Sequence, residues 1–211
     1  MVIPFSFSGC KKEDLLLSSI SELKSDIFYG ESENYSIKAS YGFRENPYIN
    51  DGKVSPLQNV LIFKLLNKQM DEATYSVSLE YGGKTYSENF THSPVRDQLT
   101  ATIVIDDFIE KEFIVKIVSA TTSEEVKLLS TLPSKTLNYK DALIALKNEQ
   151  SELIKSYTDA DGNFTAEIYM RVIVKEEKPY YYVGFGSGND KLKALLVDGL
   201  TGKTLAIREI F

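Results

Sequence analysis

The run Gly202-Lys203-Thr204 has the residue types that end a phosphate-binding loop, in which backbone amides and a lysine hold the phosphates of a nucleotide. That loop also needs a glycine five residues before Gly202, and Val197 stands there. Glycine, which has no side chain, accepts the positive backbone angle of a tight turn. We therefore predict that this run is the turn of a β-hairpin and that it binds no nucleotide.

A second polar cluster, Asp159, Asp161 and Asn163, carries the oxygen ligands that calcium prefers. In the calcium loop of helix-loop-helix proteins the sixth residue is glycine and the twelfth is glutamate. Counted from Asp159, these two positions hold Phe164 and Met170. The cluster is therefore interpreted as a turn without a metal, and weak calcium binding is the alternative.

His92 is the only histidine of the chain and Cys10 is the only cysteine. A serine or cysteine nucleophile needs a base beside it, and a zinc site needs three or four nitrogen or sulfur ligands. The proline after Thr91-His92-Ser93 indicates a loop position for the histidine. We predict no catalytic residues, no cofactor and no metal.

The aromatic run Tyr180-Tyr181-Tyr182, followed by Phe185, is the candidate for contact with a partner. Because side chains alternate along a strand, Tyr180 and Tyr182 share one face and Tyr181 takes the other. One face is expected in the core, where the tyrosines would form an ordinary cross-strand ladder. The other would present an aromatic surface to a peptide or a glycan, with Tyr180, Tyr182 and Phe185 as contact residues.

The composition is that of an ordinary folded protein with an acidic balance. Hydrophobic residues make up 43% and charged residues 26% of the 211 residues, and the formal net charge is −6. An acidic chain is repelled by the phosphates of nucleic acids and by anionic lipid head groups. The most apolar segment, Val60 to Leu66, is far too short to cross a membrane. Nucleic acid is not an expected partner, and attachment to a membrane would need an anchor.

From residue 27 to about residue 132 the pattern predicts only strands. Tyr35 to Tyr41 alternates apolar and polar residues, and Val60 to Leu66 is a continuous apolar run typical of a central strand. Thr74 to Phe90 reads as a hairpin around Gly82-Gly83. Further strands are expected over 99–105, 113–118 and 126–129. This number of short strands favours an immunoglobulin-like or fibronectin-like β-sandwich over residues 27–132.

Residues 133–138 are interpreted as a linker, because the hydrophobic period changes from two to 3.6 after them. Leu143 and Leu146 belong to a helical pattern over 139–157, with Asn138 as its N-cap. Four strands follow and end in a hairpin formed by residues 192–197 and 204–210. One helix on a small antiparallel sheet gives an α+β domain over residues 139–211.

The segment Phe7-Ser8-Gly9-Cys10, followed by two lysines, resembles the lipobox of bacterial lipoprotein signal peptides. The resemblance implies a lipid on Cys10 and an extracytoplasmic location on a membrane. Residues 1–10 would be the remnant of a signal peptide that starts upstream of Met1, and residues 11–26 a polar tether. In the alternative, Met1 is the true start, the protein is cytoplasmic, and Cys10 is a buried free cysteine.

Residues 139–211 also resemble a PepSY domain in the order of their elements and in their closing hairpin. The structural turn of that hairpin contains Asp198, Gly199, Gly202 and Lys203. Asp198 is expected to accept hydrogen bonds from turn amides, and Leu205 to resume the strand facing the core. PepSY domains occur in the propeptides of thermolysin-type metalloproteases and in bacterial envelope and secreted proteins. The resemblance implies regulation of a peptidase and supplies no catalytic residue.

These observations predict a mainly β, lipid-anchored, extracytoplasmic protein that binds a protein or peptide partner and is not an enzyme. The alternative is a glycan-binding protein of the cell wall, or a surface hydrolase that uses tyrosine and carboxylate side chains. A deep cleft that holds carboxylates would favour the alternative.

Overall fold

The computed structural model describes residues 15–47, 53–67, 74–93, 98–186 and 192–210, and within these ranges the protein is mainly β. The helices of the described ranges are α1 (Leu15–Ser18), α2 (Tyr139–Glu149) and α3 (Ser151–Ser156). The strands are β1 (Ile20–Glu31), β2 (Tyr35–Glu45), β3 (Leu57–Asn67), β4 (Ser76–Tyr81), β5 (Lys84–Asn89), β6 (Thr91–Ser93), β7 (Gln98–Val104), β8 (Glu112–Val118), β9 (Ser123–Ser130), β10 (Glu167–Lys175), β11 (Lys178–Gly186), β12 (Leu192–Asp198) and β13 (Thr204–Ile210).

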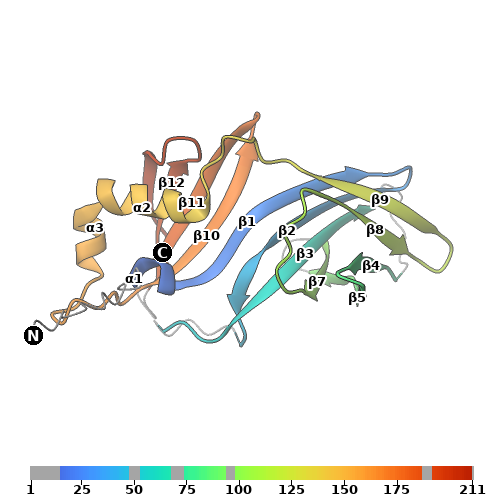
Figure 1. Ribbon diagram of the computed structural model, residues 1–211, viewed down its shortest axis with the longest axis horizontal. Coiled ribbons are helices and arrows are strands. Elements are labelled where there is room, and N and C mark those ends of the chain that lie inside the picture. The colour runs from blue at the N-terminus through green and yellow to red at the C-terminus, as the bar shows by residue number, and fades with distance from the viewer. Residues whose placement is uncertain (1–14, 48–52, 68–73, 94–97, 187–191, 211) are drawn as a thin grey trace, which may run out of the picture.

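The strands form one large, mostly antiparallel sheet that curves until it is nearly barrel-shaped (Figure 1). Its main path has the order β13-β12-β11-β10-β1-β2-β3-β7-β6. Only β1 and β10 pair in parallel along this path, with Ile20 opposite Ile168. The strands β4, β5, β8 and β9 join the path where β9 pairs with the end of β1. At that point a Cβ on Gly30 would lie 2.3 Å from the carbonyl oxygen of Lys127, so the close approach of the two strands requires glycine.

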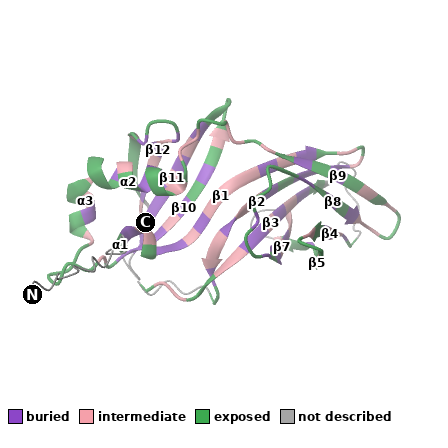
Figure 2. Ribbon diagram, viewed as in Figure 1, coloured by how far each residue is buried: buried purple, intermediate pink, exposed green. Residues whose placement is uncertain are grey.

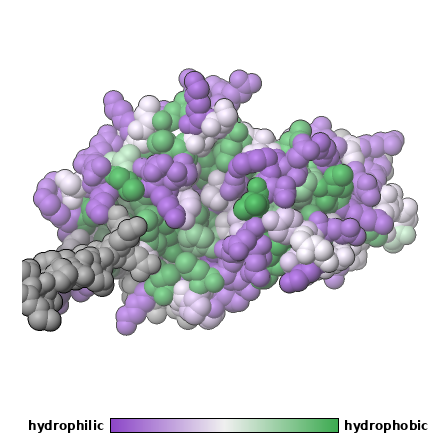
Figure 3. All heavy atoms as spheres, in the orientation of Figure 1, coloured by the Kyte–Doolittle hydropathy of each residue, from purple (hydrophilic) through white to green (hydrophobic). Residues whose placement is uncertain are grey.

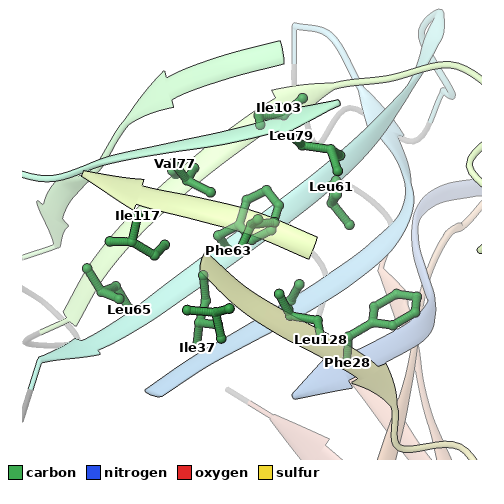
Figure 4. Packing of buried hydrophobic residues seen from close by; sticks show 14 of the residues in the cluster. Phe28, Ile37, Leu61, Phe63, Leu65, Val77, Leu79, Ile103, Ile117 and Leu128 are labelled. Carbon is green, nitrogen blue, oxygen red and sulfur yellow. The ribbon is translucent and has the colours of Figure 1, made fainter. Parts of the chain in front are cut away.

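The first hydrophobic core lies between the β1-β2-β3-β7 part of the sheet and a layer formed by β4, β8 and β9. Ile37, Leu61 and Phe63 from the sheet, and Val77 and Ile117 from the layer, are all 0% exposed. Figure 4 shows these side chains pointing toward one another from the two layers. Burial on this scale is the main stabilising contribution to a β protein of this size.

The second hydrophobic core lies under the helices, which cover the β10-β11-β12 part of the sheet (Figure 1). Leu143 and Leu146 of α2 are buried against residues such as Val183. The backbone N–H of Asp141 donates to the Asn138 side chain at 3.0 Å, so the predicted N-cap is confirmed. The single helix expected over 139–157 is two helices, because the backbone at Gln150 leaves the helical region with φ −109° and ψ 40°.

The sequence patterns locate most strands correctly. The predicted hairpin forms as β4 and β5, with positive φ at Gly82 (58°) and Gly83 (75°). Val60 to Leu66 lies inside β3, which pairs with β2 on one side and β7 on the other, as expected of a central strand. The last hairpin forms as β12 and β13.

The polar tether expected over residues 11–26 differs from the structure. Residues 15–18 form α1, and β1 begins at Ile20. Leu16, Ile20 and Leu23 are 3%, 1% and 2% exposed and belong to the helix-covered core. The sequence did not reveal this strand for two reasons. The segment is polar, and its parallel partner, β10, lies more than a hundred residues further along the chain.

The boundary expected at residue 27 falls inside β1. The first half of this strand packs under the helices through Leu23, whereas Phe28 packs in the β core. In Figure 1 the strand runs without interruption from the side of α2 and α3 to the side of β8 and β9. One hydrogen-bonded sheet therefore carries both cores on the same face.

Candidate functional site: a basic groove

A groove of 640 Å³ crosses the face of the sheet that carries neither core. Strict alternation of side chains places residues there. In β3, Phe63 enters the core while its neighbours Ile62 and Lys64 line the groove. In β10, Ile168 enters the core while Tyr169 and Arg171 line the groove. Figure 2 shows buried and exposed positions following one another along β10.

The groove is basic although the protein is acidic. Its lining contains five basic side chains and one acidic side chain, whereas the whole chain has a net charge of −6. These six residues are Lys24, Lys38, Arg44, Lys64, Arg171 and Glu22. A groove with one dominant sign of charge raises the local concentration of oppositely charged ligands. The electrostatics therefore favour an anionic ligand.

The centre of the groove holds two lysines in direct opposition. Lys38 of β2 and Lys64 of β3 are cross-strand partners, and Thr100 of β7 is the next residue in the same row. Directly opposite residues have Cβ atoms about 4.5–5.5 Å apart, and like charges at this spacing destabilise a sheet. An anion bound beside the two ammonium groups would be attracted by both.

Lys24 of the groove is paired with a carboxylate. The Lys24 Nζ lies 2.7 Å from Glu22 Oε1, and the two side chains are 28% and 30% exposed. A partly exposed pair of this kind contributes only about 0–1 kcal/mol to stability, so a ligand carboxylate can compete for the lysine.

Two tyrosines form the other end of the groove. The Arg171 guanidinium lies 4.8 Å from the ring centroid of Tyr182, its cross-strand partner. Such a contact fixes the guanidinium while leaving its N–H groups able to donate. The Tyr169 hydroxyl donates to a carboxylate oxygen of Glu167 at 2.5 Å, and Glu167 is 0% exposed. Both rings are therefore held in place before any ligand arrives.

The groove crosses many strands of the sheet. Its lining comes from seven neighbouring strands, from β11 to β6. At about 4.8 Å between strands this corresponds to ~29 Å measured along the curved sheet, so the straight length is shorter and matches several residues of extended chain at ~3.3 Å each. This shape suits a chain-like ligand better than a compact small molecule.

The predicted aromatic contact residues separate into two groups. Tyr182 lines the groove, and Tyr180 is half-buried on the same face of β11. Phe185 is 0% exposed, and its ring centroid lies 5.8 Å from that of Tyr157 in the helix-covered core. The prediction that Phe185 contacts a partner is therefore wrong, because alternation from Tyr181 places Phe185 on the core face.

The closing turn has a structural role. Asp198 Oδ1 accepts from the backbone amides of Leu200 at 2.9 Å and Thr201 at 2.8 Å. Partial burial raises the pKa of the Asp198 carboxyl, but the hydrogen bonds to Leu200 and Thr201 outweigh it and hold the pKa below its usual range. Gly202 has φ 75°, and a Cβ there would lie 2.4 Å from the Ala145 Cβ of α2.

Two further residues of that turn differ in their surroundings. A Cβ on Gly199 would lie 2.7 Å from the carbonyl oxygen of Pro179, so this position admits only glycine without a shift. Lys203 is exposed. Leu205, expected to face the core, is 49% exposed. The register of β12 and β13 shifts at this point, since Thr204 pairs with Val197 and Ala206 with Leu196, so Leu205 has no partner in β12.

The other sequence candidates lie apart from the groove centre. Asp159 Oδ1 accepts from the amides of Asp161 and Asn163 and so closes the predicted turn. His92, expected in a loop, is an exposed residue of β6. Within the ranges that the structure describes, no group of three or more His, Cys, Asp or Glu side chains is placed to hold a metal. Cys10 lies outside the described residues.

A larger hollow, of 780 Å³, lies beside the linker. Its charged groups satisfy one another, since Lys111 Nζ lies 3.2 Å from Asp26 Oδ1 and Ser25 donates to the same carboxylate at 2.8 Å. The Tyr181 hydroxyl donates to the Leu137 carbonyl oxygen at 2.6 Å, and burial raises the pKa of this tyrosine. The groove, whose cations exceed its acids, is the better binding candidate.

Sequence reasoning missed the groove lysines and arginines. Lys38 stood at a polar position of a strand predicted to be half-buried, and Lys64 lay inside the run Val60 to Leu66, which was interpreted as continuously apolar. Nothing local indicated that β2 and β3 place them opposite each other, or that Arg171 joins them from β10. The available signal was that Lys38, Lys64 and Arg171 are basic residues within predicted strands of an acidic chain.

Comparison of the chain with models of known protein families, with curated proteins and with solved structures finds no match. Among the described helices, none has the length and apolar character needed to span a membrane. The fold and the groove together define a class of protein. It is mainly β, with one large and mostly antiparallel sheet that carries the cores on one face and a basic groove on the other.

Proposed function

We propose that this protein is a non-enzymatic binding module whose groove takes an extended acidic segment of a partner protein. The observation that carries the proposal is the collection of five basic side chains in one groove of an acidic chain. Electrostatic attraction speeds the encounter with an anionic partner, and charge-assisted hydrogen bonds to Arg44 and Arg171 then hold its carboxylates.

The shape of the groove supports a peptide ligand. Its length of ~29 Å along the curved sheet matches several residues of extended chain, whose carboxylates can reach cations on successive strands. Ser40 lies on β2 with two of the cations, and Thr100 and Thr102 continue the groove on β7 beyond Lys64; all three offer hydroxyl groups to a peptide backbone. Tyr182 and Tyr169 offer apolar surface at one end. The partner is therefore expected to carry acidic residues with an aromatic or aliphatic residue beside them.

The resemblances in the sequence favour a cellular location and a class of partner for this module. The lipobox-like segment at Cys10 supports a lipid-anchored, extracytoplasmic protein. Two helices over the antiparallel strands β10–β13 support a PepSY-like unit over residues 139–211. The β layer packed on the sheet supports an immunoglobulin-like arrangement before it. An acidic segment of a peptidase is the partner that these resemblances favour.

The proposed location is tested by sequencing the codons upstream of Met1. An in-frame, lysine-rich start followed by an apolar stretch would support an anchor on Cys10. A stop codon close upstream would leave the cytoplasmic alternative.

The groove is tested with a fluorescein-labelled decaglutamate peptide and fluorescence anisotropy. Lys38→Glu replaces an attraction by a repulsion, and we expect it to weaken binding about tenfold, which corresponds to ~1.4 kcal/mol. Lys135→Glu is the matched control, because Lys135 is exposed in the linker and the same charge is reversed outside the groove. Binding is expected to weaken as salt is added.

Three outcomes would contradict the peptide assignment. A decaglutamine peptide could bind as tightly as decaglutamate, or Lys135→Glu could weaken binding as much as Lys38→Glu. An anionic cell-wall glycan could bind while decaglutamate does not, which would favour the glycan-binding alternative. Cleavage of either probe, followed by mass spectrometry, would favour the hydrolase.

A further inference from the structure

Two charged residues lie directly opposite each other at six places in the described strands. Three of these pairs join an acid to a base, which is the arrangement that stabilises a sheet. The other three join two bases, although the chain has more acidic than basic residues. The mixed pairs are Glu22–Arg44, Lys116–Glu125 and Lys193–Glu209, and the basic pairs are Lys24–Arg171, Lys38–Lys64 and Lys175–Lys178.

One of the basic pairs is explained by its own turn. Lys175 and Lys178 flank the connection between β10 and β11, which consists of Glu176 and Glu177. Two acids therefore separate the two lysines in the sequence and offset their charges. This pair does not line the groove.

The other two basic pairs both line the groove. Like charges directly opposite each other destabilise a sheet, and natural proteins keep such local conflicts chiefly at functional sites. Hydrophilic side chains cover most of the face seen in the space-filling view (Figure 3), so polar character alone marks no site on this protein. Two pairs of like charge in one groove are the feature that does.

The acid beside Lys24–Arg171 is shared among several cations. Glu22 Oε1 lies 2.7 Å from Lys24 Nζ, and Glu22 is also the cross-strand partner of Arg44. Three cations therefore surround one carboxylate at this end of the groove.

The pair Lys38–Lys64 has uncharged neighbours in its row, Tyr29 of β1 and Thr100 of β7. The Tyr29 hydroxyl donates to the carboxylate of Glu31, which is exposed and does not line the groove. Among the described residues that line the groove, each of the two pairs therefore has an excess of positive charge around it.

The two pairs lie far enough apart to meet different residues of one ligand. Lys38 and Gly42 are four residues apart on β2, and Gly42 lies opposite Lys24. Counting along β2 avoids the bulge of β1 between Lys24 and Asp26. Four residues span ~14 Å and two strand spacings span ~10 Å, so the centres of the pairs are ~17 Å apart along the sheet. Because the sheet curves, the straight separation is shorter and corresponds to about four or five residues of extended chain.

We propose that the groove has two anion subsites, one at Lys38–Lys64 and one at Lys24–Arg171, and that it selects a segment whose acidic residues form two groups about five positions apart. This selectivity rests on the proposed function, since both subsites lie in the groove that takes the acidic segment. An acidic group at either subsite is attracted by two cations at once. Binding at one subsite holds the chain near the other, and the gain is largest when the spacer matches the separation.

The test uses three fluorescein-labelled peptides, each with four glutamates and seven prolines. In the first the glutamates are contiguous, in the second two glutamate pairs are separated by three prolines, and in the third by seven; the remaining prolines follow the last glutamate. Polyproline is extended and stiff at ~3.1 Å per residue, so the pair centres are ~16 Å apart in the second peptide and ~28 Å apart in the third. We expect the second peptide to bind about tenfold more tightly than either of the others, a difference of ~1.4 kcal/mol.

The matched variants each remove one positive charge. Lys64→Gln and Arg171→Gln each weaken one subsite, and Lys135→Gln changes an exposed lysine of the linker that does not line the groove. We expect the preference for the second peptide to fall below about twofold in the first two variants and to persist in Lys135→Gln. Thermal unfolding is expected to stay similar in all three.

Decaglutamate, measured in parallel, separates the subsites from the proposed function. Equal binding of the three peptides by a protein that binds decaglutamate would overturn the two subsites and leave the acidic-segment groove in place. Loss of the preference in Lys135→Gln, or its survival in both groove variants, would also overturn the subsites. A protein that binds neither decaglutamate nor any of the three peptides would overturn the groove and its subsites together.

Discussion

The two faces of the sheet are built from the same strands, but one face packs the hydrophobic cores and the other lines the groove. On one face, alternate residues such as Phe63 enter cores closed by β4, β8 and β9 or by α2 and α3. On the other, their neighbours such as Lys64 line a basic groove. The difference shows how a sheet can place stability and recognition one residue apart, because each step along a strand changes the face.

The largest expected effect separates two adjacent residues of β3. Phe63→Ala removes a ring that is 0% exposed and should lower the free energy of unfolding by about 3–5 kcal/mol. Ile62→Ala, on the groove face, should cost about 1 kcal/mol or less. Urea unfolding followed by circular dichroism measures both. Equal losses would mean that the groove face is packed as tightly as the core, and the comparison would fail.

A second pair of neighbours, Tyr181 and Tyr182, also places one side chain on the core face and one on the groove face. Tyr181→Phe loses the hydrogen bond to the Leu137 carbonyl and should cost about 1 kcal/mol at neutral pH. Tyr182→Phe keeps its ring beside Arg171 and should change stability little.

The buried Tyr181 should also affect stability in alkaline solution. Burial raises the pKa of Tyr181 in the folded protein above its value in the unfolded chain. The unfolded chain therefore releases its proton first, and stability is retained below the ordinary tyrosine pKa of about 10 and lost as pH rises above it. The urea concentration at the midpoint of unfolding should fall less steeply with pH, between pH 8 and pH 11, in Tyr181→Phe than in the unaltered protein. Parallel slopes would remove Tyr181 as the cause.

The helices that close one part of the covered face depend on their own first turn. Asn138→Ala removes the cap that accepts from the Asp141 amide and should cost about 1 kcal/mol, whereas Asn138→Asp should keep most of it. Peptide binding in the groove should not change in either variant, because α2 lies on the other face. A shift in decaglutamate affinity would show that the two faces are coupled.

The smallest expected effect has the opposite sign. Lys38→Gln removes one of two directly opposed lysines and should raise the stability of the free protein by about 0.2–0.5 kcal/mol. The same change should weaken decaglutamate binding. Lys135→Gln serves as the control for a change in net charge. A stability loss in Lys38→Gln would show that the opposed pair is not a cost to the fold.

The sequence predicted elements better than it predicted their arrangement. Alternation in Tyr35 to Tyr41 and the glycine pair at Gly82-Gly83 identified a strand and a hairpin, since both signals act between near neighbours. The strand that begins at Ile20 was missed, because its pairing with Ile168 leaves no mark on the residues between them. The same limit applied to Leu205, which lies at a shift in the pairing register of β12 and β13 and is half exposed.

By itself the sequence determined the mainly β character, the cap at Asn138, the turn at Asp198 and the assignment of Tyr181 and Tyr182 to opposite faces. These follow from propensities and periodicities that act over a few residues. Only the tertiary structure decided that Lys38, Lys64 and Arg171 share a groove, that β1 serves both cores, and that β13 is the last described strand at one end of the sheet path. Those facts depend on which strands lie side by side, and strand pairing is a contact between distant parts of the chain whose energy comes from the whole packed sheet.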